Sequence, residues 1–274
     1  MIDYKEYQPS QQFTSFIECY WTLNSHCNDF SEKELIAPGG RAELLFNFGD
    51  PLHWHDPENI KDTQIFTGAL LLGPRDRFYF LTFTGNINVF GVRFKAGGLA
   101  PFIKIPVHEV RNIFTVQQYI IGREYDNWLS QMQSKLSADA KISFIENILF
   151  QQFCNPDISF KHTLQLISFI KSEQPESISK ICDVSGMYYK KLERNFLQYS
   201  GYSPKTFSSV NRFYKSLQMA QKNMPSLTHV GIECGYYDQA HFIREFKKFS
   251  GITPSNLEAN PTRFLKLLAQ SATV

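Results

Sequence analysis

The 274-residue sequence lacks the patterns that mark several large classes of protein. No apolar run approaches the ~18 residues that a membrane-spanning helix needs, and the first residues show no signal-peptide pattern. The five cysteines are odd in number and form no Cys-X-X-Cys pair: Cys19, Cys27, Cys154, Cys182 and Cys234. Unpaired thiols of this kind are typical of a reducing compartment. We therefore expect a cytoplasmic protein with free thiols and no membrane contact.

Recognisable catalytic motifs are missing too. No Ser-His-Asp or Cys-His arrangement and no glycine-rich phosphate loop stands out in the chain. His53 and His55 form one potential metal pair, because alternate residues of a strand share a face. No third ligand follows them at useful spacing. We expect neither an enzyme nor a cofactor, and a metal-dependent enzyme that uses His53 and His55 is the alternative.

Charge divides the chain into two unlike halves. Residues 156–274 hold 15 Lys and Arg against 9 Asp and Glu, whereas residues 1–155 hold 13 against 17. A basic half suits a polyanionic partner, and an acidic half does not. Asn155-Pro156 is the best boundary, because proline disfavours helix at the residue before it. We predict a domain over 1–155 that senses a signal or dimerises, and a DNA-binding domain over 156–274.

The first half combines short strands with later helices, so the predicted fold class is α+β with a β-rich, barrel-like N-terminal domain. The expected strands are 43–48, 70–72, 78–83 and 87–94, the last with a bulge at Gly91, and the expected loops are 27–33 and 52–64. Residues 13–21 form a strand or a short helix. Helices are expected at about 98–104, 123–137 and 139–154. The apolar stripe of the last helix could pack in the core or pair two protomers.

The second half is predicted to be all helical and contains an internal repeat. SISKICDVSG begins at Ser177 and SLTHVGIECG begins at Ser226, and each describes a helix capped by serine that ends at a glycine. Each is followed by a second helix with an apolar stripe, which makes a helix-turn-helix pattern. We predict the two units at about 177–199 and 226–250. A support helix over 160–173 precedes them, and a helix over about 204–223 connects them.

The repeat resembles the DNA-binding domain of AraC/XylS-type transcription regulators over roughly residues 158–262. The second unit carries the more diagnostic pattern, GYYDQAHFIREFKKFSGITP, from Gly235 to Pro254. The resemblance implies a transcription regulator that reads two adjacent major-groove segments of double-stranded DNA. It also implies RNA polymerase as a possible further partner.

The base-reading positions that the resemblance implies are Lys190, Glu193 and Arg194 in the first unit and Gln239, Ala240, His241, Ile243 and Arg244 in the second. Arginine can grip guanine, glutamine can grip adenine, and isoleucine can touch a thymine methyl group. Lys247 and Lys248 are expected to neutralise phosphates. The plain alternative for all these residues is a solvated helix face.

The first half resembles a sensor-like domain found ahead of such DNA-binding domains. The pieces that match are ECYW (18–21), PGG (38–40), ELLFN (43–47), LGP (72–74) and GVRFKAGG (91–98). The resemblance implies control by a small molecule, a homodimer or both. A domain that binds only another protein is the alternative, and a cavity of ~300 Å³ or more would count against it.

Overall fold

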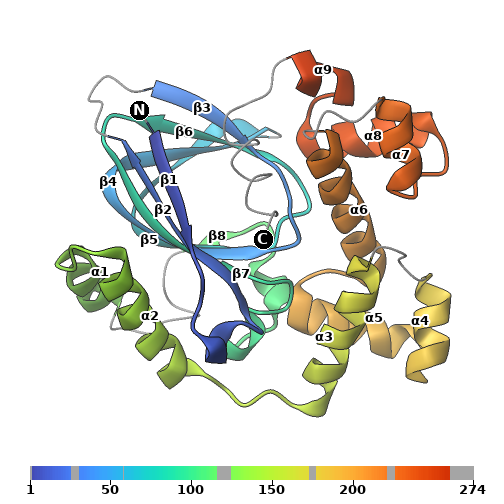
Figure 1. Cartoon of the computed structure of the whole chain (residues 1–274), viewed down its shortest axis with the longest axis horizontal. Helices are drawn as coiled ribbons and strands as arrows, with labels where there is room; N and C mark the ends of the chain where they lie inside the picture. The colour runs from blue at the N-terminus through green and yellow to red at the C-terminus, as the bar shows by residue number, and fades with distance from the viewer. Residues whose placement is uncertain are drawn as a thin grey trace.

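The computed structural model describes residues 2–25, 31–57, 59–115, 125–172, 177–220 and 226–259. A curled sheet and a group of helices lie side by side, and two further helices run beneath the sheet (Figure 1). The sheet comes from the first half of the chain, and the helical group comes from the second half. This arrangement confirms the predicted fold class.

The sheet is antiparallel and curls into a half-barrel. Its strands are β1 Ile2–Tyr7, β2 Ile17–Ser25, β3 Ser31–Ile36, β4 Ala42–Asp56, β5 Asn59–Leu72, β6 Tyr79–Thr84, β7 Ile87–Phe94 and β8 Phe114–Thr115. The strand order is β1-β2-β7-β4-β5-β8, and β6 pairs with both β3 and β4. The first half of β4 pairs with β7, and His53 to His55 of its second half pair with β6.

The loop predicted over 52–64 is wrong, because β4 and β5 form a long hairpin through most of it. Leu52 and Trp54 are buried, while their neighbours Pro51, His53 and His55 are half-buried. This is the alternation of a strand, hidden in the sequence by polar residues. Gly49-Asp50-Pro51 does not end the strand either. The register shifts between Asn47 and Leu52, and the Asp50 N–H donates to Asn86 O at 2.8 Å, so this segment is a bulge packed on the β6–β7 turn.

Two smaller predictions also fail. The loop expected over 27–33 becomes strand β3 from Ser31, whereas residues 27–30 lie outside the described ranges. Gly91 is not a bulge, because its pairing with both Trp21 and Leu45 is regular. A Cβ atom at Gly91 would lie 2.1 Å from Trp21 Cε2, so the glycine makes room for an indole ring. Residues 13–21, left open between helix and strand, mostly enter β2.

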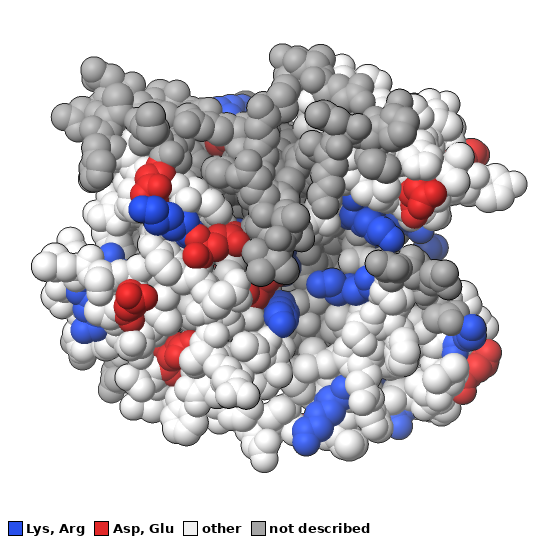
Figure 2. All heavy atoms as spheres, in the orientation of Figure 1, with Lys and Arg blue, Asp and Glu red and all other residues white. Residues whose placement is uncertain are grey.

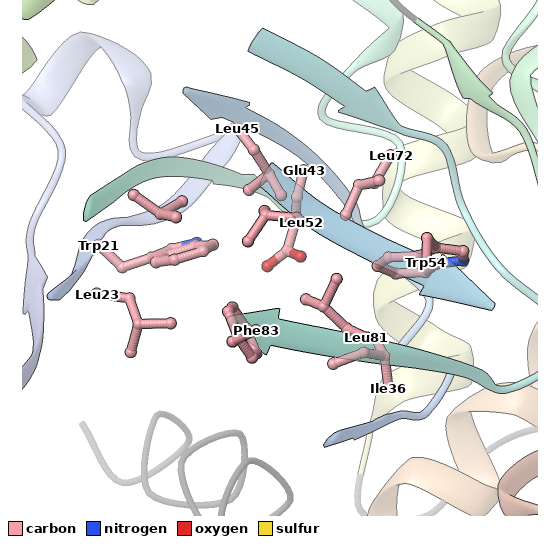
Figure 3. Close-up of a pocket in the computed structure, with 11 residues that line it drawn as sticks. Trp21, Leu23, Ile36, Glu43, Leu45, Leu52, Trp54, Leu72, Leu81 and Phe83 are labelled. Carbon is pink, nitrogen blue, oxygen red and sulfur yellow. The ribbon is translucent and has the colours of Figure 1, made fainter. Parts of the chain in front are cut away.

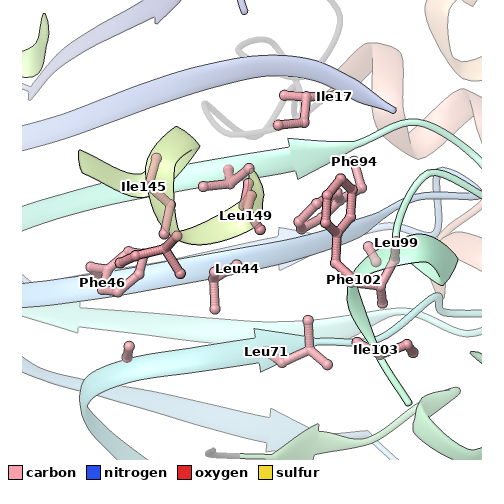
Figure 4. Packing of buried hydrophobic residues seen from close by; sticks show 14 of the residues in the cluster. Ile17, Leu44, Phe46, Leu71, Phe94, Leu99, Phe102, Ile103, Ile145 and Leu149 are labelled. Atoms are coloured by element: carbon pink, nitrogen blue, oxygen red, sulfur yellow. The ribbon is translucent and has the colours of Figure 1, made fainter. Parts of the chain in front are cut away.

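Helices α1 Tyr125–Gln133 and α2 Ala138–Gln152 cover the outer side of the half-barrel. Ile145 and Leu149 of α2 pack against Leu44 and Phe46 of β4 (Figure 4). The apolar stripe of α2 therefore packs in the core. The helix expected at 98–104 is only the 3₁₀ turn η2, Ala100–Phe102, and the 3₁₀ turns η1 Gln11–Phe13 and η3 Val107–Val110 are also short.

The helical group contains α3 Ile158–Lys171, α4 Ile178–Ser185, α5 Tyr189–Ser200, α6 Pro204–Ala220, α7 Leu227–Glu233, α8 Gln239–Ser250 and α9 Pro254–Ala259. The predicted connecting helix is α6, and residues 221–223 of that prediction lie outside the described ranges. One apolar cluster runs through these helices and includes Leu35, Ala37 and Ala96 from the half-barrel. The two halves of the chain therefore share a core.

Candidate DNA-binding surface

The first helix-turn-helix unit consists of α4 and α5. The Ser177 hydroxyl accepts from the Lys180 N–H at 3.2 Å and caps α4. Gly186 ends α4 with a φ of +63°, a conformation that costs glycine little. Leu192 and Phe196 of α5 are fully buried beneath the turn, so the opposite side of α5 is left for a partner.

The second unit repeats this geometry with α7 and α8. The Asp238 carboxylate accepts from the His241 N–H at 2.6 Å and caps α8. Gly231 of α7 lies where a Cβ atom would be 3.3 Å from Phe242 Cδ1, so the glycine allows α7 and α8 to cross closely. Phe242, Phe246 and Phe249 are buried and belong to the core.

Helix α6 packs against both units. Its Phe207 contacts Phe196 of α5, and its Phe213 contacts Phe246 and Phe249 of α8, with ring centroids 5.2 to 6.1 Å apart. A salt bridge also joins α6 to α8. Arg212 of α6 donates to both carboxylate oxygens of Glu245 on α8, at 2.9 to 3.0 Å. A bidentate pair of this kind fixes orientation as well as distance.

The predicted base-reading residues and the predicted phosphate contacts Lys247 and Lys248 lie on the outer faces of α5 and α8, which we call the reading helices. Lys190, Arg194, Gln239, Ala240, Ile243, Arg244, Lys247 and Lys248 are exposed, and Glu193 and His241 are half-buried. Glu193 accepts from the Tyr189 hydroxyl at 3.4 Å, and His241 lies 3.9 Å from Glu245. Arg194 and Arg244 are thus available to a partner rather than packed inside.

The visible charge follows the same division. On the face shown in Figure 2, Lys and Arg outnumber Asp and Glu over the helical side of the molecule, and both signs mix over the half-barrel. Exposed cations beside amide and aliphatic side chains suit a DNA groove, which offers phosphates along its walls and base edges at its floor.

A cluster of buried charges, which the sequence did not reveal, joins the half-barrel to α6. We call it the arginine seam and define it by Arg41, Glu43, Arg75, Arg93 and Tyr214, which line one small cavity. Arg93 Nε donates to Glu43 at 2.8 Å, and Arg41 bonds to Glu18 and to the Tyr214 hydroxyl of α6. In the sequence, Arg41 and Arg75 follow turns and Arg93 lies near the end of a strand. No helical or strand spacing relates the three, so the sequence does not show that they are neighbours.

Arg75 is the least satisfied member of the arginine seam. Its Nη2 lies 3.9 Å from Glu43, and its Nε and Nη1 atoms have no hydrogen-bond partner among the described residues. Burial lowers the pKa of Arg75 despite the nearby Glu43 carboxylate. Its carbonyl oxygen accepts from the Tyr202 hydroxyl at 2.7 Å, which ties this loop to the residues that follow α5.

The interior of the half-barrel holds a separate cavity between Trp21 and Trp54, with Glu43 on its wall (Figure 3). Its volume is about 20 Å³, which is room for about one water molecule. This cavity is therefore far smaller than the ~300 Å³ that would count against a purely protein-binding domain.

The histidine pair of the metal hypothesis lies on β4. His55 is hydrogen-bonded by Thr63 at 3.0 Å and by Thr82 at 3.1 Å, and burial together with Lys33 and His53 lowers its pKa. No group of three or more His, Cys, Asp or Glu in the described ranges is placed to hold a metal ion. The described helices are also too short or too polar to cross a membrane.

Two family models match the chain. Residues 5–115 match a domain of unknown function (DUF6597), and residues 181–260 match a helix-turn-helix domain. The second match begins in α4 and extends through α9.

Curated proteins match the chain in part. The HTH-type transcriptional activator RhaS of Escherichia fergusonii is 25% identical over 156 residues, which cover 55% of this chain and 54% of the relative. The HTH-type transcriptional regulator ArgR of Pseudomonas aeruginosa is 28% identical over 82 residues, which cover 30% and 25%. The chain therefore spans about half the length of RhaS and less of ArgR.

Among solved structures, ToxT from Vibrio cholerae aligns over 91% of this chain and 98% of its own, with 12% identity and a TM-score of 0.47. An overlap at this level carries no argument about function.

Proposed function

We propose that this chain, whose residues 181–260 form a helix-turn-helix domain of the AraC type, is a sequence-specific DNA-binding transcription regulator. The resemblance expected from the repeat is confirmed in this part of the chain. The proposal extends it to the whole molecule, in which the two reading helices enter adjacent major-groove segments of one duplex.

One observation carries the proposal. Two copies of a helix pair, each with a serine cap on its first helix and a buried inner stripe, present an exposed arginine at the same position of the second helix, Arg194 and Arg244. Helix α6 has 17 residues, which at 1.5 Å per residue is about 25 Å. A rod of that length is comparable to the ~34 Å of one DNA turn, so the two units can address one side of the duplex.

The test is selection of bound fragments from random duplexes with the full chain, followed by titration of Arg194→Ala and Arg244→Ala variants. We expect a motif with two half-sites about one turn apart. Each variant should lose about 10-fold or more on the selected duplex and far less on random DNA. Lys248→Ala is the control, because a phosphate contact weakens binding to both duplexes alike. Equal losses for the arginine variants would reduce them to phosphate contacts.

A signal received in the half-barrel is proposed to act through the arginine seam. Glu43 lies on the wall of the interior cavity and also in the seam cavity, where Arg41 contacts Tyr214 of α6. A small molecule must push the lining side chains apart to enter so small a space, and that movement displaces Glu43. A protein partner that deforms the half-barrel would act on the same contacts.

The proposal assigns no catalytic step and places the molecule where its DNA is, in the cytoplasm. Contact with RNA polymerase and pairing of two chains stay predictions. The division at 155/156 also stays a prediction, and limited proteolysis that cuts between α2 and α3 would support it.

A further inference from the structure

A hollow of about 300 Å³ lies against the outer face of the first reading helix. One wall is α5, with Lys190, Glu193, Arg194 and Leu197 among its lining residues, and the other wall includes Pro106 and His108 of the half-barrel side. Three of the predicted base-reading residues therefore face a space that the N-terminal half of the chain helps to enclose.

The position of this second wall is fixed by packing. Val107, between Pro106 and His108, is buried at 1% exposure. A Cβ atom at Gly201, which caps the C-terminal end of α5, would lie 3.2 Å from Val107 Cγ1 and 3.3 Å from Val107 O. Figure 1 shows α5 on the barrel side of its unit, with α4 on the outside. Because η3 and the end of α5 touch, His108 keeps its place beside the helix.

The charge of the hollow suits a phosphate. Lys190, Arg194 and His108 are exposed on its lining, and Glu193 is the one carboxylate among the lining residues. The Tyr189 hydroxyl donates to Glu193 at 3.4 Å. On a helix, Tyr189 and Glu193 are one turn apart on the flank away from Arg194, so this contact draws the carboxylate away from the cations.

A helix in the major groove has phosphates at both flanks. An α-helix with its side chains is ~10–12 Å wide, and the groove is ~12 Å wide, so the sugar-phosphate strands pass close to the sides of the helix. Because the reading residues of α5 form one wall of the hollow and η3 the other, a duplex that brings base edges to α5 must bring the sugar-phosphate strand on the η3 side into the hollow. It then lies between Arg194 and His108.

We infer that the hollow receives a backbone phosphate of the bound duplex and that His108, from the N-terminal half, is a DNA-contacting residue. This inference rests on the proposed function. It makes the DNA-binding surface composite, so that η3 adds affinity without reading the base sequence.

The test compares His108→Ala and His108→Lys in the full chain, on the selected duplex and on random DNA, over a range of salt concentrations. His108→Ala should weaken binding to both duplexes by about threefold to tenfold. His108→Lys should strengthen both and steepen the salt dependence by about one counterion. His162→Ala on α3 is the matched control, since His162 is also exposed and does not line the hollow. Thermal melting should show all three variants folded.

Two results would overturn the inference. Unchanged affinity in both His108 variants would leave His108 outside the interface. Tighter binding by His108→Ala would mean that η3 obstructs α5, so that the N-terminal half inhibits rather than assists. The proposed function is judged separately, because it requires Arg244→Ala to lose affinity for the selected duplex whatever His108 does.

Discussion

Replacing Arg93 by methionine should destabilise the half-barrel strongly, because it leaves a buried carboxylate without its main partner. Arg93 is 2% exposed and bonds to Glu43 at 2.8 Å and to Glu6 at 3.0 Å. Methionine fills much of the same volume without donating. After the change, the nearest cation of the arginine seam is Arg75, 3.9 Å from Glu43. Removal of one partner from a buried ion pair costs about 3–5 kcal/mol, and the residual attraction of Arg75 favours the lower end.

The loss should depend on pH in a defined direction. Burial raises the pKa of Glu43, but Arg93 and Arg75 together lower it below its usual value. A lowered pKa in the folded state stabilises the fold above the unfolded value of ~4.3, and that stability is lost as the pH falls. In Arg93→Met burial dominates, so the penalty is largest near neutral pH and shrinks once Glu43 takes up a proton.

The measurement is urea unfolding followed by tryptophan fluorescence, at neutral pH and near pH ~4.5. The double variant Arg93→Met/Glu43→Gln should recover part of the lost stability, because no buried charge remains. A loss below about 1 kcal/mol for Arg93→Met, or a double variant less stable than the single one, would refute the argument that Glu43 depends on Arg93.

Three further outcomes are expected. Gly91→Ala would place a methyl group 2.1 Å from the Trp21 indole and should cost about 1–3 kcal/mol in thermal or chemical unfolding. Burial raises the pKa of Cys19 to about 12 although Arg93 opposes it, so alkylation near pH ~8 followed by mass spectrometry should modify exposed Cys154 and spare Cys19. Asp238→Ala removes the N-cap of α8 and should lower the free energy of unfolding by about 1 kcal/mol. DNA affinity should also fall, because the predicted base-reading residue Gln239 is the first residue of the helix that loses its cap.

The helical half could be predicted from the sequence because its information is local. Ser177 and Ser226 cap helices, Gly235 follows the C-cap of α7 with a φ of +77°, and Asp238 caps the next helix, each through contacts within a few residues. The repeat supplied a second copy of the serine cap and the apolar stripe, although Tyr188 at the start of α5 makes no side-chain cap like that of Asp238. Apolar residues at helical spacing then placed the core face of each helix, and the outer faces followed.

The half-barrel was harder to predict because its information is long-range. The β4–β5 hairpin carries histidines and aspartates that resemble a loop, and only the pairing of β4 with β5 and β6 shows why His53 and His55 occur in a strand. The role of Gly91 could be recognised only from its contact with Trp21, which is 70 positions earlier in the chain. The arginine seam joins strands and a helix that no periodicity relates, so its residues could be identified only in three dimensions.

The contacts of the half-barrel change what α6 can be expected to do. If α6 were the sole link, it would set the distance between the reading helices, but the C-terminal ends of both helices also pack against one segment of the half-barrel. A Cβ atom at Gly201 would lie 3.2 Å from Pro74 Cγ, and one at Gly251 would lie 2.4 Å from Phe78 Cζ. Pro74 and Phe78 are four residues apart. A displacement of this short segment would therefore press on both helix-turn-helix units at once. In the proposed regulator, a signal that shifts this segment should therefore change the spacing between the two units, even though α6 stays intact.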